Sequence, residues 1–132
     1  HLTTRRQRQM CIRDSHGEGW GMPIHDAMMH DSLVVTTKYG GITESLNSSN
    51  SLLIKHKIVN VKPMDWNPYY HEYQNWADPD VGHLKLLMRK AFEMNQRDRL
   101  DITRRARSVA SRSSINGFSE KIEAIFDSSR FK

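Results

Sequence analysis

A glycine-rich turn that leads directly into a proline is the feature that most restricts how this chain can fold. Residues 16–21, HGEGWG, contain three glycines, and Pro23 follows two residues later. Glycine adopts backbone conformations that other residues avoid, and proline is well tolerated at the start of a helix because its missing N–H would have no partner there. The pattern predicts a tight turn followed by a helix that starts at Pro23.

The residues after this turn predict alternating helices and strands. The helix that starts at Pro23 is expected to end near residues 30–31, where the apolar stripe stops. Three short apolar segments predict strands at 33–37, 52–54 and 58–61, and the first is apolar and β-branched enough to be buried on both faces. Strands that alternate with helices indicate an α/β fold with a parallel sheet, here of about three strands at most.

The second half of the chain predicts an aromatic loop and three helices. Residues 63–76 contain two prolines and five tyrosine or tryptophan rings, which we interpret as an ordered loop packed by its rings. Asp78 is predicted to cap the next helix, with Pro79 at its first position. Apolar residues at helical spacing predict the core-facing sides of the helices: Val81, Leu84, Met88, Ala91 and Phe92, then Ile102, Ala106, Val109 and Ala110, then Phe118, Ile122, Ile125 and Phe126.

The amino-terminal residues 1–14 differ from the rest of the chain. Residues 5–14, RRQRQMCIRD, match consecutive codons of a transposase sequencing adapter that has been translated in one frame. We therefore predict that 1–14 is an adapter-derived artefact without ordered structure and that the protein proper occupies 15–132, with an upstream part missing. The alternative is a natural basic arm that binds nucleic acid or acidic lipid.

Composition restricts the remaining classes of function. Leaving out 1–14 lowers Lys plus Arg from 20 to 16 and Asp plus Glu from 15 to 14, so the net charge falls from +5 to about +2. The single cysteine, Cys11, is lost as well. The sequence therefore does not favour a nucleic-acid partner, and it contains no apolar run of the roughly 18 residues that a membrane span needs. The three histidines between 16 and 30 do not include a pair at the i, i+4 spacing of a helical zinc site, so no metal site is predicted.

Several motifs together resemble one enzyme family. Residues 18–28, EGWGMPIHDAM, resemble the EGxGxPxxEAM signature of the family-4-type (group 1) glycosyltransferases, which have the two-Rossmann-domain GT-B fold. Further segments follow in the family's order: LVVTT at 33–37 matches its "PVIAT" strand, YGGITE at 39–44 its "sGxxE", NSLLI at 50–54 its "NsxLI", and WADPDV at 76–81 the start of its "WAePDvxxLxxlMR" helix. The resemblance spans roughly residues 15–126 and implies a partial Rossmann-like domain with parallel strands and carboxy-terminal helices.

The resemblance also implies roles for particular residues. Glu18 would be the catalytic-site carboxylate that binds hydroxyls of the donor sugar, and Asp26, eight residues later, would hold the ribose. The backbone of the turn would approach the sugar and the diphosphate, because amides at a helix amino terminus favour negative charge. This donor-binding set consists of Gly17, Gly19, Trp20, Gly21, Met22 and Asp26.

Three positions depart from the family pattern. Asp26 stands where the family has a glutamate, and Leu33 stands at its strand-opening proline. Asp31 stands at a family glycine, although aspartate tolerates the left-handed conformation better than most residues.

The function implied is retaining transfer from a UDP-, GDP- or ADP-sugar without a metal ion or other cofactor. The family's cationic Arg and Lys and its acceptor-binding amino-terminal domain lie upstream of these motifs, so the chain is expected to be inactive alone and to work with that missing domain. The alternative is a non-catalytic nucleotide-sugar-binding domain of the same fold. Trp20 is expected to pack rather than to stack on a ligand.

Overall fold

A three-stranded parallel sheet forms the centre of the molecule. The computed structural model describes residues 10–13, 16–17, 19–62, 69–113 and 115–129. The sheet has the order β1 (Met10–Arg13), β2 (Leu33–Thr37) and β3 (Leu52–Ile54), with Val35 of β2 opposite Ile12 on one side and Leu52 on the other. The predicted α/β class with a parallel sheet is therefore confirmed.

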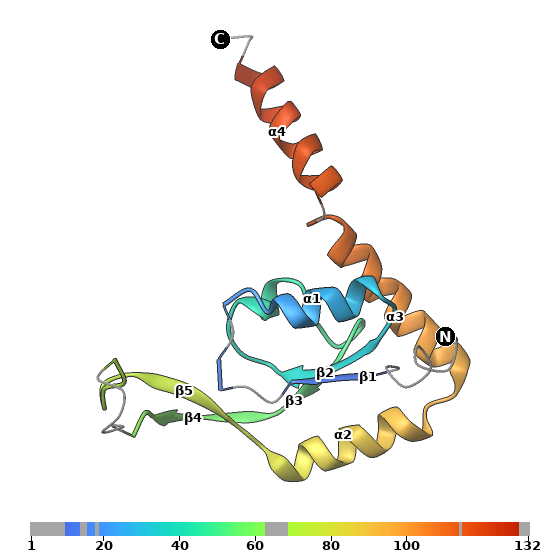
Figure 1. Cartoon of the computed structure of the whole chain (residues 1–132). Coiled ribbons are helices and arrows are strands. Elements are labelled where there is room, and N and C mark those ends of the chain that lie inside the picture. The colour runs from blue at the N-terminus through green and yellow to red at the C-terminus, as the bar shows by residue number, and fades with distance from the viewer. Residues whose placement is uncertain (1–9, 14–15, 18, 63–68, 114, 130–132) are drawn as a thin grey trace, which may run out of the picture.

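Helices cover both faces of this sheet, as Figure 1 shows. α1 (Met22–Met29) and α3 (Gln96–Ser111) pack on the face to which Val34 points, and α2 (Val81–Glu93) packs on the face of Leu33 and Val35. Side chains alternate between the two faces along a strand, so β2 contributes to two separate apolar clusters. All five of its residues are buried, and the prediction of a strand covered on both sides is confirmed.

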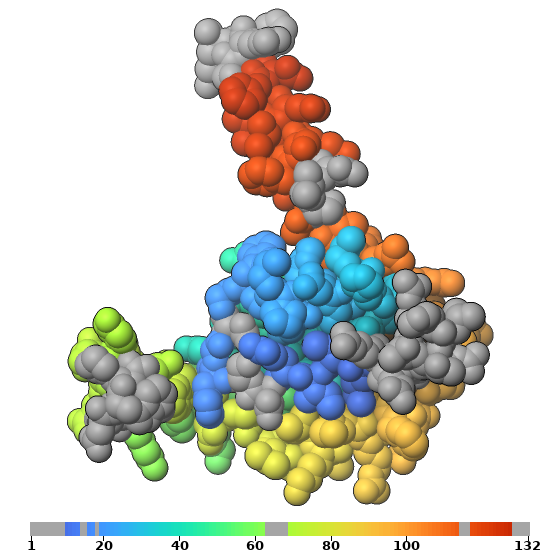
Figure 2. Space-filling view, in the orientation of Figure 1, coloured from blue at the N-terminus to red at the C-terminus, as the bar shows by residue number. Residues whose placement is uncertain are grey.

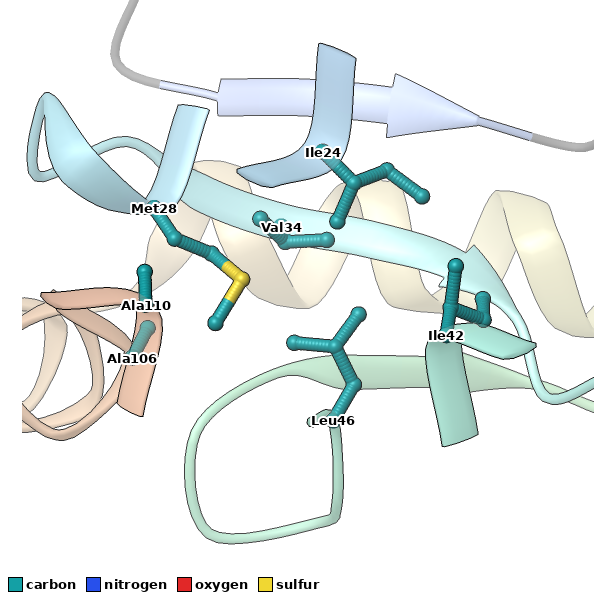
Figure 3. Close-up of a cluster of buried hydrophobic side chains, with 7 residues drawn as sticks. All are labelled: Ile24, Met28, Val34, Ile42, Leu46, Ala106 and Ala110. Atoms are coloured by element: carbon teal, nitrogen blue, oxygen red, sulfur yellow. The ribbon is translucent and has the colours of Figure 1, made fainter. Parts of the chain in front are cut away.

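The two clusters differ in what they hold together. The first joins the sheet to α1, α3 and the short 3₁₀ helix η1 (Gly41–Glu44), and Figure 3 shows Met28 lying between Val34 and the two alanines of α3. Its members are Ile24, Met28, Val34, Ile42, Leu46, Ala106 and Ala110. The second joins the sheet to α2 through Leu33, Val35, Leu52, Ile54 and Ala91.

β1 differs from the prediction that residues 1–14 lack ordered structure. Met10–Arg13 pair in parallel with β2, and Met10 packs against the second apolar cluster. A strand edge presents unpaired N–H and C=O groups that a short apolar segment can satisfy, which explains how these residues join the sheet. Residues 1–9 and 14 lie outside the described residues.

An antiparallel hairpin takes in the end of the predicted aromatic loop, because Asn75 and Trp76 lie in a strand while residues 69–74 form neither helix nor strand. β4 (His56–Asn60) pairs with β5 (Asn75–Pro79), so the described chain has five strands rather than about three, and the strand predicted at 58–61 begins two residues earlier. Residues 63–68 of the predicted loop lie outside the described residues. Figure 1 shows this hairpin projecting from the helix-covered sheet.

The helix after the hairpin begins later than predicted. Asp78 pairs with Lys57 in the hairpin and Pro79 ends β5, so Asp80 is the residue that caps α2. The backbone N–H of His83 donates to the Asp80 carboxylate at 2.9 Å and holds the pKa of that carboxyl below its ordinary value. Two aspartates two residues apart both fit a cap, and the pairing of β5 selects the second.

All of the residues predicted to face the core do so in only one of the three helices, α3. In α3, Ala106 and Ala110 are buried as expected, with Ile102 and Val109 packed against the clusters. In α2, Leu84 and Ala91 face the second cluster as predicted and are joined by Leu87, while Val81, Met88 and Phe92 are exposed. Phe92 is 84% exposed because it follows Ala91 by one residue, which turns its side chain about 100° around the helix.

The last helix also departs from its predicted packing. α4 (Ile115–Ser129) forms, but its predicted core residues Phe118, Ile125 and Phe126 are exposed, and Figure 1 shows α4 extending away from the rest of the molecule. Among the described residues, no helix is both apolar and long enough to cross a bilayer.

Candidate functional site

The glycine-rich turn lies at the carboxyl end of a parallel strand and at the start of a helix. β1, α1 and β2 form a βαβ unit in which residues 14–21 connect Arg13 to α1. In open α/β sheets, ligands bind in the crevice outside the carboxyl ends of the strands, and phosphates bind at the helix amino terminus that follows a glycine-rich turn. The predicted turn and helix are thus in the arrangement that an anionic ligand needs.

No side chain caps the amino terminus of α1. Its N-cap is Gly21, which makes no side-chain cap hydrogen bond, and the first turn contains no acidic side chain. The N–H groups of Ile24 and His25 both donate to the Gly21 carbonyl, at 2.9 and 3.0 Å. The helix begins at Met22, one residue before the predicted start, which places Pro23 at its second position. The positive end of the helix dipole therefore faces the turn, and no carboxylate in the first turn of α1 competes for it.

Gly21 joins the turn to a second loop at the same edge of the sheet. It is buried with φ 73, and a Cβ at this position would lie 2.7 Å from Cγ2 of Ile42 in η1. Gly40, which precedes η1, also has a positive φ, of 84. Residues 38–44 follow the carboxyl end of β2, so this close approach brings two strand-end loops side by side.

The structure places most of the predicted donor-binding residues around the helix start. Gly17, Gly19, Trp20 and Met22 are exposed, and Asp26 is exposed about one turn into α1. Glu18, the predicted catalytic residue, lies outside the described residues. The Trp20 ring is 54% exposed and its centroid is 6.4 Å from that of His25, so the expectation that Trp20 packs is not met.

Two buried polar atoms at this edge were not predicted. Thr37 Oγ1, at the carboxyl end of β2, and His56 Nδ1, just after β3, are buried without a hydrogen-bond partner among the described residues. The His56 ring lies 5.5 Å from that of Tyr39, between centroids. The position of Thr37 at the end of a buried strand was the signal that could have marked it as a site residue, because strand ends line such crevices.

Thr37→Val is expected to leave the free energy of unfolding unchanged or to raise it by about 0.5 kcal/mol, because it removes an unsatisfied buried hydroxyl at nearly constant shape. The matched control is Thr103→Val, since Thr103 is equally buried and its hydroxyl donates to the Leu100 carbonyl at 3.3 Å. That variant is expected to lose about 1 kcal/mol. Urea unfolding of both variants provides the comparison, and equal losses at the two positions would contradict this account of Thr37.

Comparison of the sequence with known proteins does not identify a family for this chain. No model of a known protein family matches the chain, and no curated protein matches it either. In the described part of the chain, no group of three or more His, Cys, Asp or Glu residues is arranged to hold a metal ion.

Proposed function

We propose that this chain is the donor-binding part of a retaining GT-B glycosyltransferase of the family-4 type, and that it binds a UDP-, GDP- or ADP-sugar. The observation that supports this most directly is the glycine-rich turn at the amino terminus of α1, which no side chain caps and which lies beside the loop that follows β2. A diphosphate bound there would meet backbone amides and the positive end of a helix dipole.

In this proposal, different site residues bind different parts of the donor. Glu18 binds hydroxyls of the sugar, the amides of residues 19–22 face the diphosphate, and Asp26 holds the ribose. An ionised carboxylate that accepts two hydroxyls distinguishes sugar epimers, because a misplaced hydroxyl leaves it unpaired. Asp26 is exposed on α1, so a ribose can reach its carboxylate.

A backbone detail at the far end of α1 also supports the family resemblance. Asp31 has φ 54, a left-handed conformation that glycine adopts most readily, and it stands where the family has a glycine. The backbone turns there as a glycine would permit. The Asp31 carboxylate also forms an ion pair with Arg107 of α3, with 2.7 Å between Asp31 Oδ2 and Arg107 Nη1. The departure from the family residue is therefore compatible with the family's backbone path.

Transfer to an acceptor requires more than this part of the site. The proposed partner is the amino-terminal domain of the same enzyme, which in the family binds the acceptor, while an Arg and a Lys upstream of these motifs balance the charge of the leaving nucleoside diphosphate. The chain alone is expected to bind a donor without transferring its sugar.

A titration of the ¹⁵N-labelled chain with UDP-glucose, GDP-mannose and ADP-glucose tests donor binding. At least one is expected to shift the amide signals of Gly19, Gly21 and Met22 more than those of α4. Asp26→Ala is expected to weaken binding about fivefold to tenfold, the loss of about 1–1.4 kcal/mol that an ordinary hydrogen bond at an exposed position contributes. Asp101→Ala, which removes an exposed carboxylate from α3, serves as the control and should leave affinity unchanged. Absence of turn shifts with all three donors at millimolar concentration would rule the proposal out.

A further inference from the structure

The hairpin contacts the glycine-rich turn directly, although the two are far apart in sequence. The N–H of Ala77 in β5 donates to the His16 carbonyl at 2.9 Å, and His16 Nδ1 is 2.8 Å from the Ala77 carbonyl. A carbonyl can only accept, so the Nδ1 of His16 is the protonated nitrogen in this bond. Two hydrogen bonds therefore join residues 16 and 77, one between their backbones and one from the His16 side chain to the Ala77 backbone.

Aromatic stacking reinforces this contact. The rings of His16 and Trp76 are nearly parallel, with centroids 4.5 Å apart and planes 15° apart, and the ring of Tyr70 meets Trp76 edge-on at 5.9 Å. Ala77 is fully buried. Trp76 therefore lies between the start of the glycine-rich turn and the far end of the hairpin.

Hydrogen bonds hold the hairpin together along its length and attach its base to the residues before β4 and at the start of α2. Its two strands are paired from His56 and Pro79 to Asn60 and Asn75, and the N–H of Val61 extends the ladder by donating to the Gln74 carbonyl at 2.9 Å. At its base, the N–H of Asp80 donates to the Lys55 carbonyl at 2.8 Å, and the N–H of Lys55 donates to His83 Nδ1 at 3.0 Å. Figure 2 shows the hairpin standing out from the body of the molecule, attached at this end.

Gly17 and Gly19 of the turn lie away from the other described residues. A Cβ on Gly17 or on Gly19 would meet no other atom within 4 Å in the described part of the chain. The far end of the turn is fixed by Gly21, which packs against Ile42. The near end is fixed at His16, two residues before Glu18, by the contacts to β5.

We propose that Trp76 is a positioning residue for the donor site, holding His16 so that the glycine-rich turn keeps the conformation that accepts a nucleotide sugar. This inference rests on the proposed function, because it assigns a role in donor binding. A turn held at both ends loses less conformational freedom when a ligand binds, and binding is correspondingly tighter. Loosening one end is therefore expected to weaken donor binding while the sheet and its helices stay folded.

The first test needs no donor. Hydrogen exchange of the Ala77 amide, measured by NMR on the 132-residue chain, reports local opening of the His16 contact. Trp76→Ala is expected to accelerate this exchange about threefold to tenfold, the effect of losing one aromatic pair. The exchange rate of Ala77 in Trp76→Phe, which keeps a stacking ring, should stay close to wild type, and the exchange rate of the Val35 amide should be unchanged in both variants.

Tyr73→Ala is the matched control, because Tyr73 is 78% exposed and stacks on His71 rather than on the turn. Unchanged Ala77 exchange in Trp76→Ala overturns the inference.

The second test measures the affinity of the same variants for whichever of UDP-glucose, GDP-mannose and ADP-glucose the wild-type chain binds. Trp76→Ala is expected to bind about threefold to tenfold more weakly, with Trp76→Phe and Tyr73→Ala near wild type. Equal affinity of Trp76→Ala and wild type, despite faster Ala77 exchange, overturns the positioning role. If the wild-type chain binds none of the three, the proposed function fails and the positioning role fails with it. The exchange comparison then shows separately whether Trp76 holds the turn.

Discussion

Gly21→Ala is expected to lower the free energy of unfolding by about 2–4 kcal/mol, the largest stability effect that we predict for a single substitution in the site. Two causes add. Gly21 has φ 73, which costs an alanine about 1–2 kcal/mol. Its new Cβ would also lie 2.7 Å from Cγ2 of the buried Ile42 side chain, so η1 or α1 would have to shift.

Urea unfolding followed by circular dichroism measures this loss, and Gly19→Ala is the control. Gly19 belongs to the same turn, but a Cβ there would meet no other described atom within 4 Å and its φ is not in the left-handed region. Gly19→Ala is therefore expected to change stability by less than about 0.5 kcal/mol. Similar losses at the two positions would show that the conformation of Gly21 is not the cause.

Glu18→Gln is expected to weaken donor binding about 10-fold to 100-fold, the largest effect on binding that we predict. The substitution keeps the size of the side chain and removes the charge that strengthens its hydrogen bonds to sugar hydroxyls, and such bonds contribute about 1.5–3 kcal/mol each. Calorimetric titration with the donor that binds the wild-type chain measures the loss. Glu120→Gln removes the same charge from the exposed surface of α4 and should have no effect. If the Glu18→Gln chain binds the donor with wild-type affinity, Glu18 does not contribute to donor binding.

Local sequence was sufficient for the elements whose pattern has a single solution. The apolar and largely β-branched residues 33–37 predicted a strand covered on both faces, and the helical spacing of Ala106 and Ala110 predicted the core-facing side of α3. The turn before Pro23 was likewise predictable, because glycines followed by proline have few alternatives. These elements form α1, β2 and the side of α3 that packs on them, whereas β1, the first strand of the βαβ unit, was not predicted.

Elements that depend on distant partners were not predictable. β5 is a strand because residues 75–79 pair with 56–60, and nothing in WADP favours a strand over the helix cap that we predicted for Asp78. The contact between His16 and Ala77 spans 61 residues, so no local pattern contains it. Phe92 shows a related limit: amphipathic spacing finds an apolar stripe but does not decide which edge of that stripe meets the core.

The hairpin has a consequence for how this chain can vary and be engineered. Its ladder pairs only β4 with β5, and the parallel sheet shares none of those hydrogen bonds. Residues inserted or deleted between Val61 and Gln74 would therefore change how far the tip extends while leaving the register at His56 and Pro79 intact. A peptide tag or fluorescent protein placed there would sit at a distance from the βαβ unit, and homologous chains are expected to tolerate differences in length at this point.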